Sequence, residues 1–266
     1  MQDLKVVLCQ SRQYWEDKKA NLEHFEALLK NVEGVDLIIF PEMFHTGFTM
    51  EVTGLAESMD HPMGIDWLKE QAARRQSCFY TSLITEKEGK FYNTGVFVRP
   101  NGELSYYNKR KLFTLAGEDQ YYTPGKEAKI VELKGWRINL QICYDLRFPE
   151  LSRNLVVEGR PNYDLCLYVA NWPERRIAHW KALLPARAIE NQSYVIGVNR
   201  MGQDGNELTY SGDSLAYNAL GERLNDENAY QECIQEVELS YAHLEQVRAK
   251  LNFLKDVTLE VPLKRL

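Results

Sequence analysis

Short apolar runs alternate with amphipathic stretches along this chain, and the alternation restricts the folds that it can adopt. Residues 5–9 (KVVLC) and 36–40 (DLIIF) have the nearly uninterrupted apolar character of buried strands. Residues 17–32, which lie between them, place apolar side chains at helical spacing. Because strand and helix patterns continue to alternate toward the C-terminus, the sequence predicts an α/β fold rich in sheet.

The remaining elements follow from the same periodicities and from turn residues. Helices are predicted at residues 64–76, 149–158 and 177–191, and the last is expected to be interrupted near Pro185. A hairpin is predicted around Glu88 and Gly89. Strands are predicted at residues 78–85, 91–98, 137–143, 165–170, 194–199, 214–217 and 233–237. No linker, repeat or low-complexity tract separates these elements, so we expect one domain spanning residues 1–266.

Composition and charge argue for a globular protein that acts on a small molecule. The chain is 44% hydrophobic and 26% charged, and its formal net charge of -6 gives no reason to expect nucleic-acid binding. The N-terminus lacks the pattern of a secretory signal, and no apolar run is long enough to span a membrane. The five cysteines show no CxxC or Cys/His pairing, so neither disulfides nor a zinc site is expected. These features favour the reducing cytoplasm.

Several chemistries that depend on a metal, a nucleotide or a serine nucleophile lack their sequence motifs here. The chain contains neither GxGxxG nor GxxxxGK[ST], and both HExxH and GxSxG are absent. The histidines share no spacing typical of metal ligands; they are His24, His45, His61, His179 and His243. We therefore expect no metal and no cofactor.

Glu42 follows a predicted buried strand and has apolar neighbours in the segment 41–44 (PEMF). Polar residues at the ends of buried strands are held at one edge of the sheet, which is the usual place for chemistry in α/β folds. A carboxylate enclosed by apolar groups is a usable general base. Taken alone, however, a glutamate after a proline is more often a solvated loop residue.

The segment 106–113 (YYNKRKLF) interleaves three cations with aromatic and apolar residues. A run of charges is usually a solvated face, but Tyr107, Leu112 and Phe113 need a place to pack. One lysine of this segment is therefore expected to face a pocket. There it would stabilise a developing oxyanion or lower the pKa of a nearby thiol.

Cys143 ends a predicted apolar strand a few residues before Pro149, where a helix is expected to begin. A thiol on such an elbow between strand and helix is well placed to act as a nucleophile. Because a free thiol has a pKa of about 8.5, it needs a base or a nearby cation to react at neutral pH. Glu42 and Lys109 are the candidates for those two groups. Without them, Cys143 would be a buried structural cysteine, as the other four are expected to be.

Glutamate, lysine and cysteine in this order, each with these flanking residues, resemble the three signatures of the nitrilase superfamily of carbon–nitrogen hydrolases. The matching segments are 41–44 (PEMF), 107–113 (YNKRKLF) and 143–151 (CYDLRFPEL), and the likeness covers nearly the whole chain. Three downstream segments are also similar to the family, namely 186–191 (ARAIEN), 199–202 (NRMG) and 212–214 (GDS). The resemblance implies a four-layer α-β-β-α sandwich that forms a homodimer through its helical layer.

The resemblance also implies a catalytic triad of Glu42, Lys109 and Cys143. A second glutamate of the family lies shortly before a Pro-Gly pair, and Glu118 fits that position, although the loop after Lys109 is shortened. In such a site the first glutamate takes the thiol proton as the sulfur attacks an amide carbonyl. The lysine and the backbone N–H of Tyr144 would then stabilise the oxyanion.

Within the superfamily, nitrilases show Cys-Trp-Glu at the nucleophile, whereas the Cys-Tyr-Asp of this chain resembles amidases. The segments around Phe48 and Trp172 are most similar to bacterial omega-amidases, which deamidate 2-oxoglutaramate and 2-oxosuccinamate through a cysteine thioester. A dicarboxylate monoamide needs a cation at the far end of its pocket, and Arg175 or Arg176 would provide it. Phe48 and Trp172 would form apolar walls.

Other functions remain open on the residues alone. An N-carbamoyl-amine amidohydrolase would use the same triad on a ureido group, and another small aliphatic amidase would use it on a different amide. An inactive binding or scaffold protein of this fold would be expected to lose triad residues, and all three are present. The simplest alternative is an unrelated α/β domain in which Glu42, Lys109 and Cys143 never meet, so their distances decide the matter.

Overall fold

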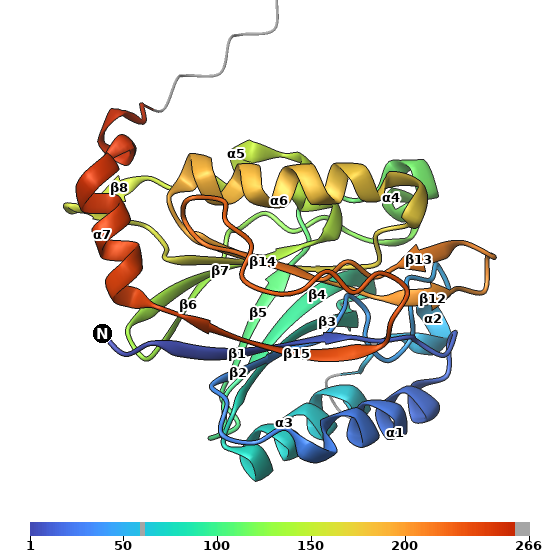
Figure 1. Cartoon of the computed structure of the whole chain (residues 1–266). Coiled ribbons are helices and arrows are strands. Elements are labelled where there is room, and N and C mark those ends of the chain that lie inside the picture. Colours follow the sequence, from blue (N-terminus) through green and yellow to red (C-terminus); the bar gives the residue numbers. More distant parts are fainter. Residues whose placement is uncertain (59–61, 259–266) are drawn as a thin grey trace, which may run out of the picture.

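Two β-sheets lie face to face at the centre of the molecule, with helices on both outer sides (Figure 1). The computed structural model describes residues 1–58 and 62–258. Within these residues, the first sheet has six strands in the order β15 (Cys233–Leu239), β1 (Leu4–Gln10), β2 (Leu37–Ile39), β3 (Cys78–Lys87), β4 (Lys90–Val98) and β5 (Leu104–Asn108). The second has five, in the order β14 (Leu215–Tyr217), β11 (Tyr194–Asn199), β10 (Leu165–Ala170), β7 (Trp136–Ile142) and β6 (Ile130–Leu133).

Strand direction determines which loops meet. Strands β1, β2 and β3 pair in parallel, as do β7, β10 and β11. Strand β4 is antiparallel to both β3 and β5, so β5 runs in the same direction as β2. Strands that run in the same direction end at the same edge of a sheet. The residues that follow β2 and β5 therefore lie at one edge, and those that follow β7 and β10 lie at one edge of the other sheet.

Helices cover the outer face of each sheet. On the first sheet, α1 (Lys18–Leu28) and α3 (Met63–Arg75) bury Phe25 and Leu68 against strand residues such as Phe79. On the second sheet, α6 (Ile177–Asn191) buries Trp180 and Leu184. Short helices lie at α2 (Val52–Leu55), α4 (Glu118–Tyr121) and α5 (Pro149–Ser152), and α7 (Tyr241–Leu251) follows β15. The predicted four-layer α-β-β-α sandwich is confirmed.

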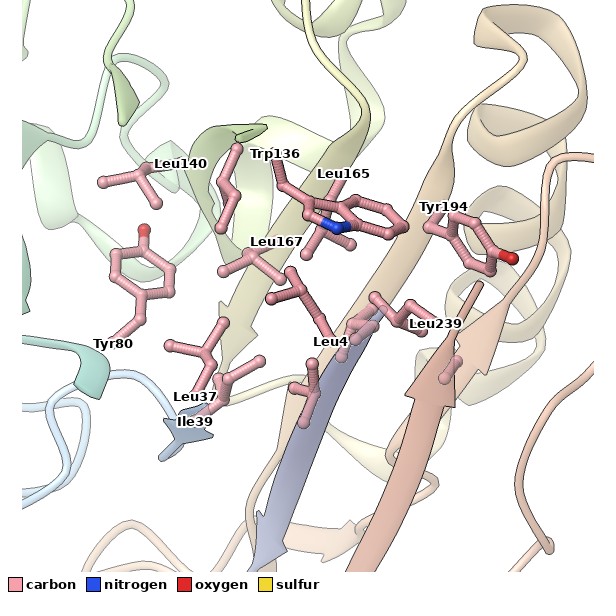
Figure 2. Packing of buried hydrophobic residues seen from close by; sticks show 14 of the residues in the cluster. Leu4, Leu37, Ile39, Tyr80, Trp136, Leu140, Leu165, Leu167, Tyr194 and Leu239 are labelled. Atoms are coloured by element: carbon pink, nitrogen blue, oxygen red, sulfur yellow. The ribbon is translucent and has the colours of Figure 1, made fainter. Parts of the chain in front are cut away.

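The inner core lies between the sheets and draws side chains from both (Figure 2). Leu4 and Tyr80 come from the first sheet, whereas Trp136, Leu167 and Tyr194 come from the second. The Trp136 ring is fully buried, 5.6 Å from the Tyr194 ring between centroids. Because each fully buried leucine of this core contributes about 1.5–3 kcal/mol, the core holds the two sheets together.

Two predicted elements differ from the structure. The helix predicted at 149–158 is wrong, because α5 ends at Ser152 and a small hairpin follows, β8 (Val156–Val157) and β9 (Arg160–Pro161). Glu158 and Gly159, which join these strands, both have positive φ, as do Glu88 and Gly89 in the correctly predicted hairpin of β3 and β4. The same turn signal was therefore present in the sequence at both places.

The predicted interruption near Pro185 is also wrong, because α6 continues through it. Proline lacks the N–H that an α-helix needs at this point, so the helix loses one backbone hydrogen bond. Packing offsets the loss. A Cβ on Gly197 of β11 would lie 2.5 Å from Trp180 and 2.7 Å from Leu184, so the glycine lets α6 approach the sheet closely.

Several elements had no prediction. They include β5, β6, α2, α4 and α7, together with the short hairpin of β12 (Met201–Gln203) and β13 (Thr209–Ser211). Two of them shape the site, since β5 presents the lysine segment and the β12–β13 hairpin forms a wall. None of the helices found in 1–58 and 62–258 is long and apolar enough to cross a membrane.

Candidate active site

Four predicted catalytic residues meet beside one cavity of about 310 Å³. Glu42 follows β2 and Lys109 follows β5, so both come from the edge of the first sheet. Cys143 follows β7 of the second sheet and also lines the cavity. Glu118, the first residue of α4, is fully buried behind them. The alternative of an unrelated domain, in which these residues never meet, is therefore excluded.

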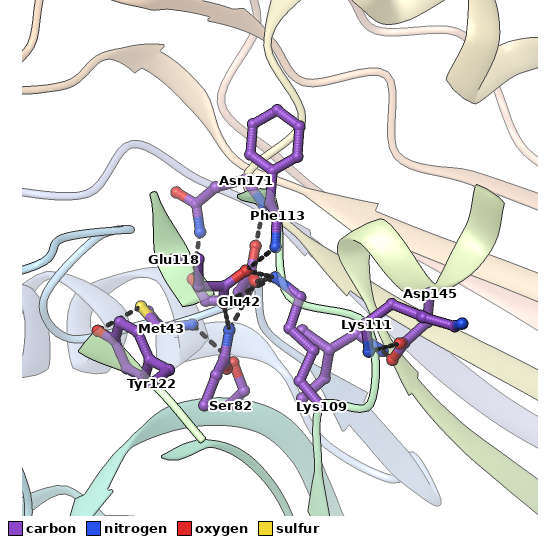
Figure 3. Close-up of polar contacts among 12 residues, drawn as sticks. Glu42, Met43, Ser82, Lys109, Lys111, Phe113, Glu118, Tyr122, Asp145 and Asn171 are labelled. Atoms are coloured by element: carbon purple, nitrogen blue, oxygen red, sulfur yellow. Dashed lines mark hydrogen bonds and ion pairs between the residues drawn. The ribbon is translucent and has the colours of Figure 1, made fainter. Parts of the chain in front are cut away.

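Lys109 lies between two carboxylates (Figure 3). Its Nζ is 2.9 Å from Glu42 Oε1 and 2.9 Å from Glu118 Oε2, and the side chain is almost completely buried. Burial disfavours its charge, but the charges of Glu118 and Glu42 outweigh this effect and raise its pKa well above the ordinary value. Lys109 is therefore a permanent cation whose charge is balanced by two anions.

The backbone around Glu42 and Glu118 fixes both carboxylates. Asn171 is the residue after β10. Its backbone N–H donates to Glu42 Oε2 at 2.8 Å, and its side-chain amide donates to the Glu42 backbone carbonyl at 2.6 Å. The Phe113 N–H donates to Glu118 Oε2 at 2.5 Å. Burial, opposed by Lys109 and aided by Glu42, raises the pKa of Glu118. Sequence reasoning missed Asn171, although its position after a buried strand is the signal that identified Glu42.

Cys143 opens the 3₁₀ turn Cys143–Arg147 with a left-handed φ of 44°. Burial raises the pKa of its thiol well above the ordinary value, and the Glu42 carboxylate raises it further while Lys109 lowers it. A hydrogen bond to Glu42 acts in the same direction. Lys109 lowers the thiol pKa as expected, but burial and Glu42 raise it by more. The thiol is protonated at neutral pH and already faces its base.

Asp145, which the sequence analysis did not select, anchors this turn. Its carboxylate is fully buried and accepts the Tyr107 hydroxyl at 2.7 Å, the Ile142 N–H at 3.0 Å and the Lys111 N–H at 3.0 Å. Burial raises its pKa, and these three donors oppose that rise. The contacts join the strand end that carries Cys143 to the segment that carries Lys109.

Three of the candidate substrate-binding residues line the main cavity, namely Phe48, Arg175 and Arg176. The ring centroid of Phe48 lies 5.2 Å from Lys109 Nζ, so it shields the lysine from water. Arg175 is exposed, whereas Arg176 is half-buried and stacks on Phe113 at 5.0 Å. Burial lowers the pKa of Arg176, and the neighbouring Arg175 lowers it further. Both remain cations, since arginine keeps its charge in proteins.

Trp172 and Tyr144 lie beside the main cavity rather than in its wall. Both line a smaller hollow of about 20 Å³ that Cys143 also borders. The Trp172 indole is buried, donates to the Arg176 carbonyl at 2.8 Å and lies 5.4 Å from the Trp180 ring. Trp172 therefore holds the turn that presents Arg176. Tyr144 lies 5.0 Å from the Phe113 ring, and its amide belongs to the first turn after Cys143, where helical N–H groups lack partners within the turn.

A wall of the cavity that the sequence did not reveal comes from the loop between β12 and β13. Asp204, Asn206, Leu208 and Tyr210 line the cavity from this side. Asp204 accepts the amides of Asn206 and Leu208 at 2.8 and 3.0 Å and the Tyr210 hydroxyl at 2.8 Å. Both oxygens of this carboxylate are thus engaged by the loop itself.

Metal-binding groups were also sought among the acidic, histidine and cysteine side chains. Within the described ranges, no three such residues are grouped so as to hold a metal ion. His61 lies outside those ranges.

Comparisons with known proteins show the family of the chain. The family model for carbon-nitrogen hydrolases matches residues 5–249. Omega-amidase YafV of Escherichia coli (strain K12) is 43% identical over 256 residues, which are 96% of this chain and 97% of that protein. A 2-oxoglutaramate amidase of Bacillus subtilis is 30% identical over 86% of this chain and 87% of its own.

A solved structure is similar over its full length. It is XC1258 from Xanthomonas campestris, a CN-hydrolase superfamily protein with an arsenic adduct in the active site. It superposes with a TM-score of 0.95 at 42% identity, covering 98% of this chain and 99% of its own. With the family model matching most of its length, the chain belongs to the carbon-nitrogen hydrolase family, within the nitrilase superfamily.

Proposed function

We propose that this enzyme is an omega-amidase, which hydrolyses the terminal carboxamide of 2-oxo dicarboxylate monoamides such as 2-oxoglutaramate and 2-oxosuccinamate. The observation that carries the proposal is that the Cys143 thiol shares one cavity with Glu42, Lys109 and two arginines. The relatives named omega-amidase and 2-oxoglutaramate amidase support the substrate class.

In the acylation step, the Cys143 sulfur attacks the carboxamide carbon while Glu42 takes the thiol proton. Their hydrogen bond provides the path for that proton. In the resting site Lys109 Nζ lies within 3.0 Å of one Glu42 oxygen and of both Glu118 oxygens. Because two of its contacts go to the same carboxylate, one of its three ammonium hydrogens can turn from Glu118 toward the developing oxyanion. The Tyr144 N–H would be the second donor to that oxygen. Protonated Glu42 then gives its proton to the leaving nitrogen, and ammonia departs from the thioester.

In the deacylation step, water attacks the thioester carbonyl. Glu42, again a carboxylate, takes a proton from this water, and the sulfur leaves as the thiol once the proton has returned to it. Glu118 supports the step through Lys109, to which both of its oxygens lie within 3.0 Å. The product is the free dicarboxylate.

Cys143→Ala tests the assignment of the nucleophile. Ammonia release should fall by about three orders of magnitude or more, because no other group can form the thioester. The thermal midpoint should stay close to that of the wild type, since the side chain is small. Cys233→Ala is the matched control, because Cys233 is also half-buried but lies on β15, away from the cavity. A Cys143→Ala enzyme that releases ammonia at the wild-type rate would refute the proposal.

The distal carboxylate of the substrate is assigned to Arg175 and Arg176. No ion pair to a carboxylate of the described residues engages either guanidinium, and the Asp204 oxygens are occupied. If Arg175 or Arg176 binds this carboxylate, replacing that arginine by alanine should lower kcat/KM for 2-oxoglutaramate by about 10- to 100-fold. The kcat/KM for a neutral amide of similar length should change little. Steady-state kinetics on both amides measures this, and unchanged discrimination in Arg175→Ala and Arg176→Ala would remove both residues.

The alternative substrate is an N-carbamoyl amine, which would be cleaved by the same thiol. Such a reaction releases carbon dioxide together with ammonia, whereas a carboxamide releases ammonia alone. A panel that contains 2-oxo acid monoamides, glutamine, asparagine and N-carbamoyl compounds therefore separates the two activities in one assay.

We further propose a cytoplasmic homodimer that associates through the outer helical layer. Ile189, on α6, is an apolar side chain with 53% of its surface exposed, and Val156 and Val157 beside α5 are exposed as well. All five cysteines are free thiols, as suits a reducing compartment. Light scattering should give about twice the chain mass, and Ile189→Asp should shift the protein toward the monomer.

A further inference from the structure

Asn93 contacts both glutamates of the active site, although nothing in its sequence setting marks it. It lies on β4 and is 1% exposed. Its side-chain nitrogen lies 2.8 Å from Glu42 Oε1 and 3.2 Å from Glu118 Oε1, so one amide hydrogen is available for each carboxylate. Its backbone carbonyl accepts the Lys109 N–H at 2.9 Å. A single residue thus contacts all three charged residues that act on the thiol.

We propose that Asn93 is the positioning residue of the reaction, which holds Glu42 and Glu118 at a fixed separation by donating one amide hydrogen to each. The proposal rests on the proposed function, because it assigns Asn93 to the proton transfer between Cys143 and Glu42. Asn93 does not line the substrate cavity and is therefore not a catalytic residue.

The charge balance explains why a neutral donor is needed at this point. Two carboxylates that face each other repel, and Lys109 alone supplies one positive charge for two negative ones. A second cation would cancel the net negative charge of the two carboxylates and one lysine beside the thiol. An amide instead stabilises both charged carboxylates without changing the net charge. The Asn93 oxygen is buried without a hydrogen-bond partner in the described part of the chain, so its role lies in its nitrogen.

Loss of these two hydrogen bonds should affect turnover more than substrate binding. A hydrogen bond to a charged group contributes about 1.5–3 kcal/mol, which corresponds to about 10- to 100-fold in rate if it is expressed in the transition state. Because Asn93 lies outside the cavity wall, KM should stay within about threefold of the wild type. The acid limb of the pH–rate profile should move to higher pH, because the carboxylates lose a donor that favours their ionised form.

The experiment compares asparagine, serine and alanine at position 93 and uses a substitution of the neighbouring Thr94 as the control. Asn93→Ser keeps one donor hydrogen, and Asn93→Ala keeps none. Thr94→Val is the matched control: the next residue on β4 is 3% exposed and points to the opposite face, where its hydroxyl contacts Thr85 at 2.6 Å and Asn108 at 2.8 Å. This control removes buried hydrogen bonds from the same strand without touching a carboxylate.

The expected result is graded. Asn93→Ala lowers kcat by about 10- to 100-fold and shifts the acid limb upward, Asn93→Ser falls between it and the wild type, and Thr94→Val keeps the wild-type profile. A wild-type kcat and acid limb in Asn93→Ala would overturn the inference. So would a Thr94→Val enzyme with the same losses, because the effect would then come from packing of the strand.

Failure of the proposed function and failure of the role of Asn93 give different results. If Asn93→Ala does not fold, Asn93→Ser decides alone, and an acid limb identical to that of Thr94→Val overturns the inference. If Cys143→Ala retains ammonia release, the proposed function is wrong. If Cys143→Ala is inactive while the position-93 variants behave as the wild type, the function stands and only the role of Asn93 is refuted.

Discussion

Burial is the main reason that the pKa of the Cys143 thiol is raised, and the charges of Glu42 and Glu118 raise it further while Lys109 lowers it. With its pKa raised, the sulfur stays protonated at neutral pH. A protonated thiol is a poor target for oxidants and alkylating agents. In the proposed mechanism, the thiolate is thus formed only when Glu42 accepts the proton during attack on a substrate.

The orientation of that thiol depends on Asp145. In Asp145→Asn the amide group replaces an oxygen that accepts from Tyr107 or Lys111, so at least one buried donor is left unpaired. We expect kcat to fall about 10-fold or more and the unfolding midpoint to drop by several degrees. Tyr107→Phe, which removes one of the three donors, should show a smaller loss in both. Wild-type turnover in Asp145→Asn, measured by ammonia release, would contradict the role assigned to this carboxylate.

The sequence pointed to Glu42 and Cys143 because each follows a predicted apolar strand, and to Lys109 because it lies in a run of cations interleaved with aromatic residues. The structure brings all three to one cavity. Asn93 and Asp145 escaped notice because their partners lie far away in the chain, 51 residues in the case of Asn93 and Glu42. Their roles depend on the pairing of β4 and the path of the turn after β7, which local periodicity does not specify.

At the scale of elements, one buried network ties the segment after β2 to the helices that cover the first sheet. Glu57 Oε1 lies 2.9 Å from both Lys18, at the start of α1, and His45, in the turn after Glu42. Its other oxygen accepts the Gly64 N–H at 2.9 Å, in the first turn of α3. The loop that carries the catalytic base is thereby fastened to both helices.

This network predicts a stability that depends on pH. Burial raises the pKa of Glu57, but His45 and Lys18 outweigh burial and lower it below 4.5. A lowered folded-state pKa stabilises the protein above the unfolded value and loses that contribution as pH falls through the folded one. Glu57→Gln should therefore cost about 2–4 kcal/mol at pH 7 and progressively less below about pH 4.5.

Thermal unfolding of both proteins at pH 7, 5.5 and 4 measures this difference. The control is Asp66→Asn, which removes an exposed partner of Lys69 and should change stability by less than about 0.5 kcal/mol. A difference between wild type and Glu57→Gln that grows as the pH falls would show that the sign is wrong.

Element boundaries were predictable where periodicity and turn residues agreed, as in the hairpin of β3 and β4. They failed where tertiary packing decided the outcome. Pro185 is tolerated inside α6 because its neighbours are buried against Gly197, a contact between segments that are separate in sequence. Strand β5 was not predicted because its alternating residues include the polar Asn108, and its pairing with β4 decides its conformation.

At the scale of the whole molecule, the two sheets share one apolar core. Strands of both sheets contribute to it, so neither sheet can bury its inner face without the other. This shared core supports the proposal that the chain is a single domain. The sandwich could be inferred from the family signatures in the sequence. The order of strands within each sheet could be read only from the structure.

A shared core predicts one cooperative unfolding transition. Trp67 packs on the first sheet, Trp136 lies between the sheets and Trp180 covers the second, so tryptophan fluorescence reports on every layer. In a urea titration its midpoint should coincide with that of far-ultraviolet circular dichroism. Two separated midpoints would show that the sheets unfold as independent units and would refute the single-domain proposal.

The pairing of β1 with β15 has a consequence for how the enzyme is made. Leu4 lies opposite Leu239, so the first strand to leave the ribosome has to wait for β15, near the end of the chain, before its sheet is complete. Until translation reaches β15, one edge of β1 has no partner, and an open apolar edge invites association with other chains. A nascent or truncated polypeptide that already contains all the proposed catalytic residues therefore still lacks part of the scaffold that aligns them, and full activity is expected only after synthesis has passed residue 239.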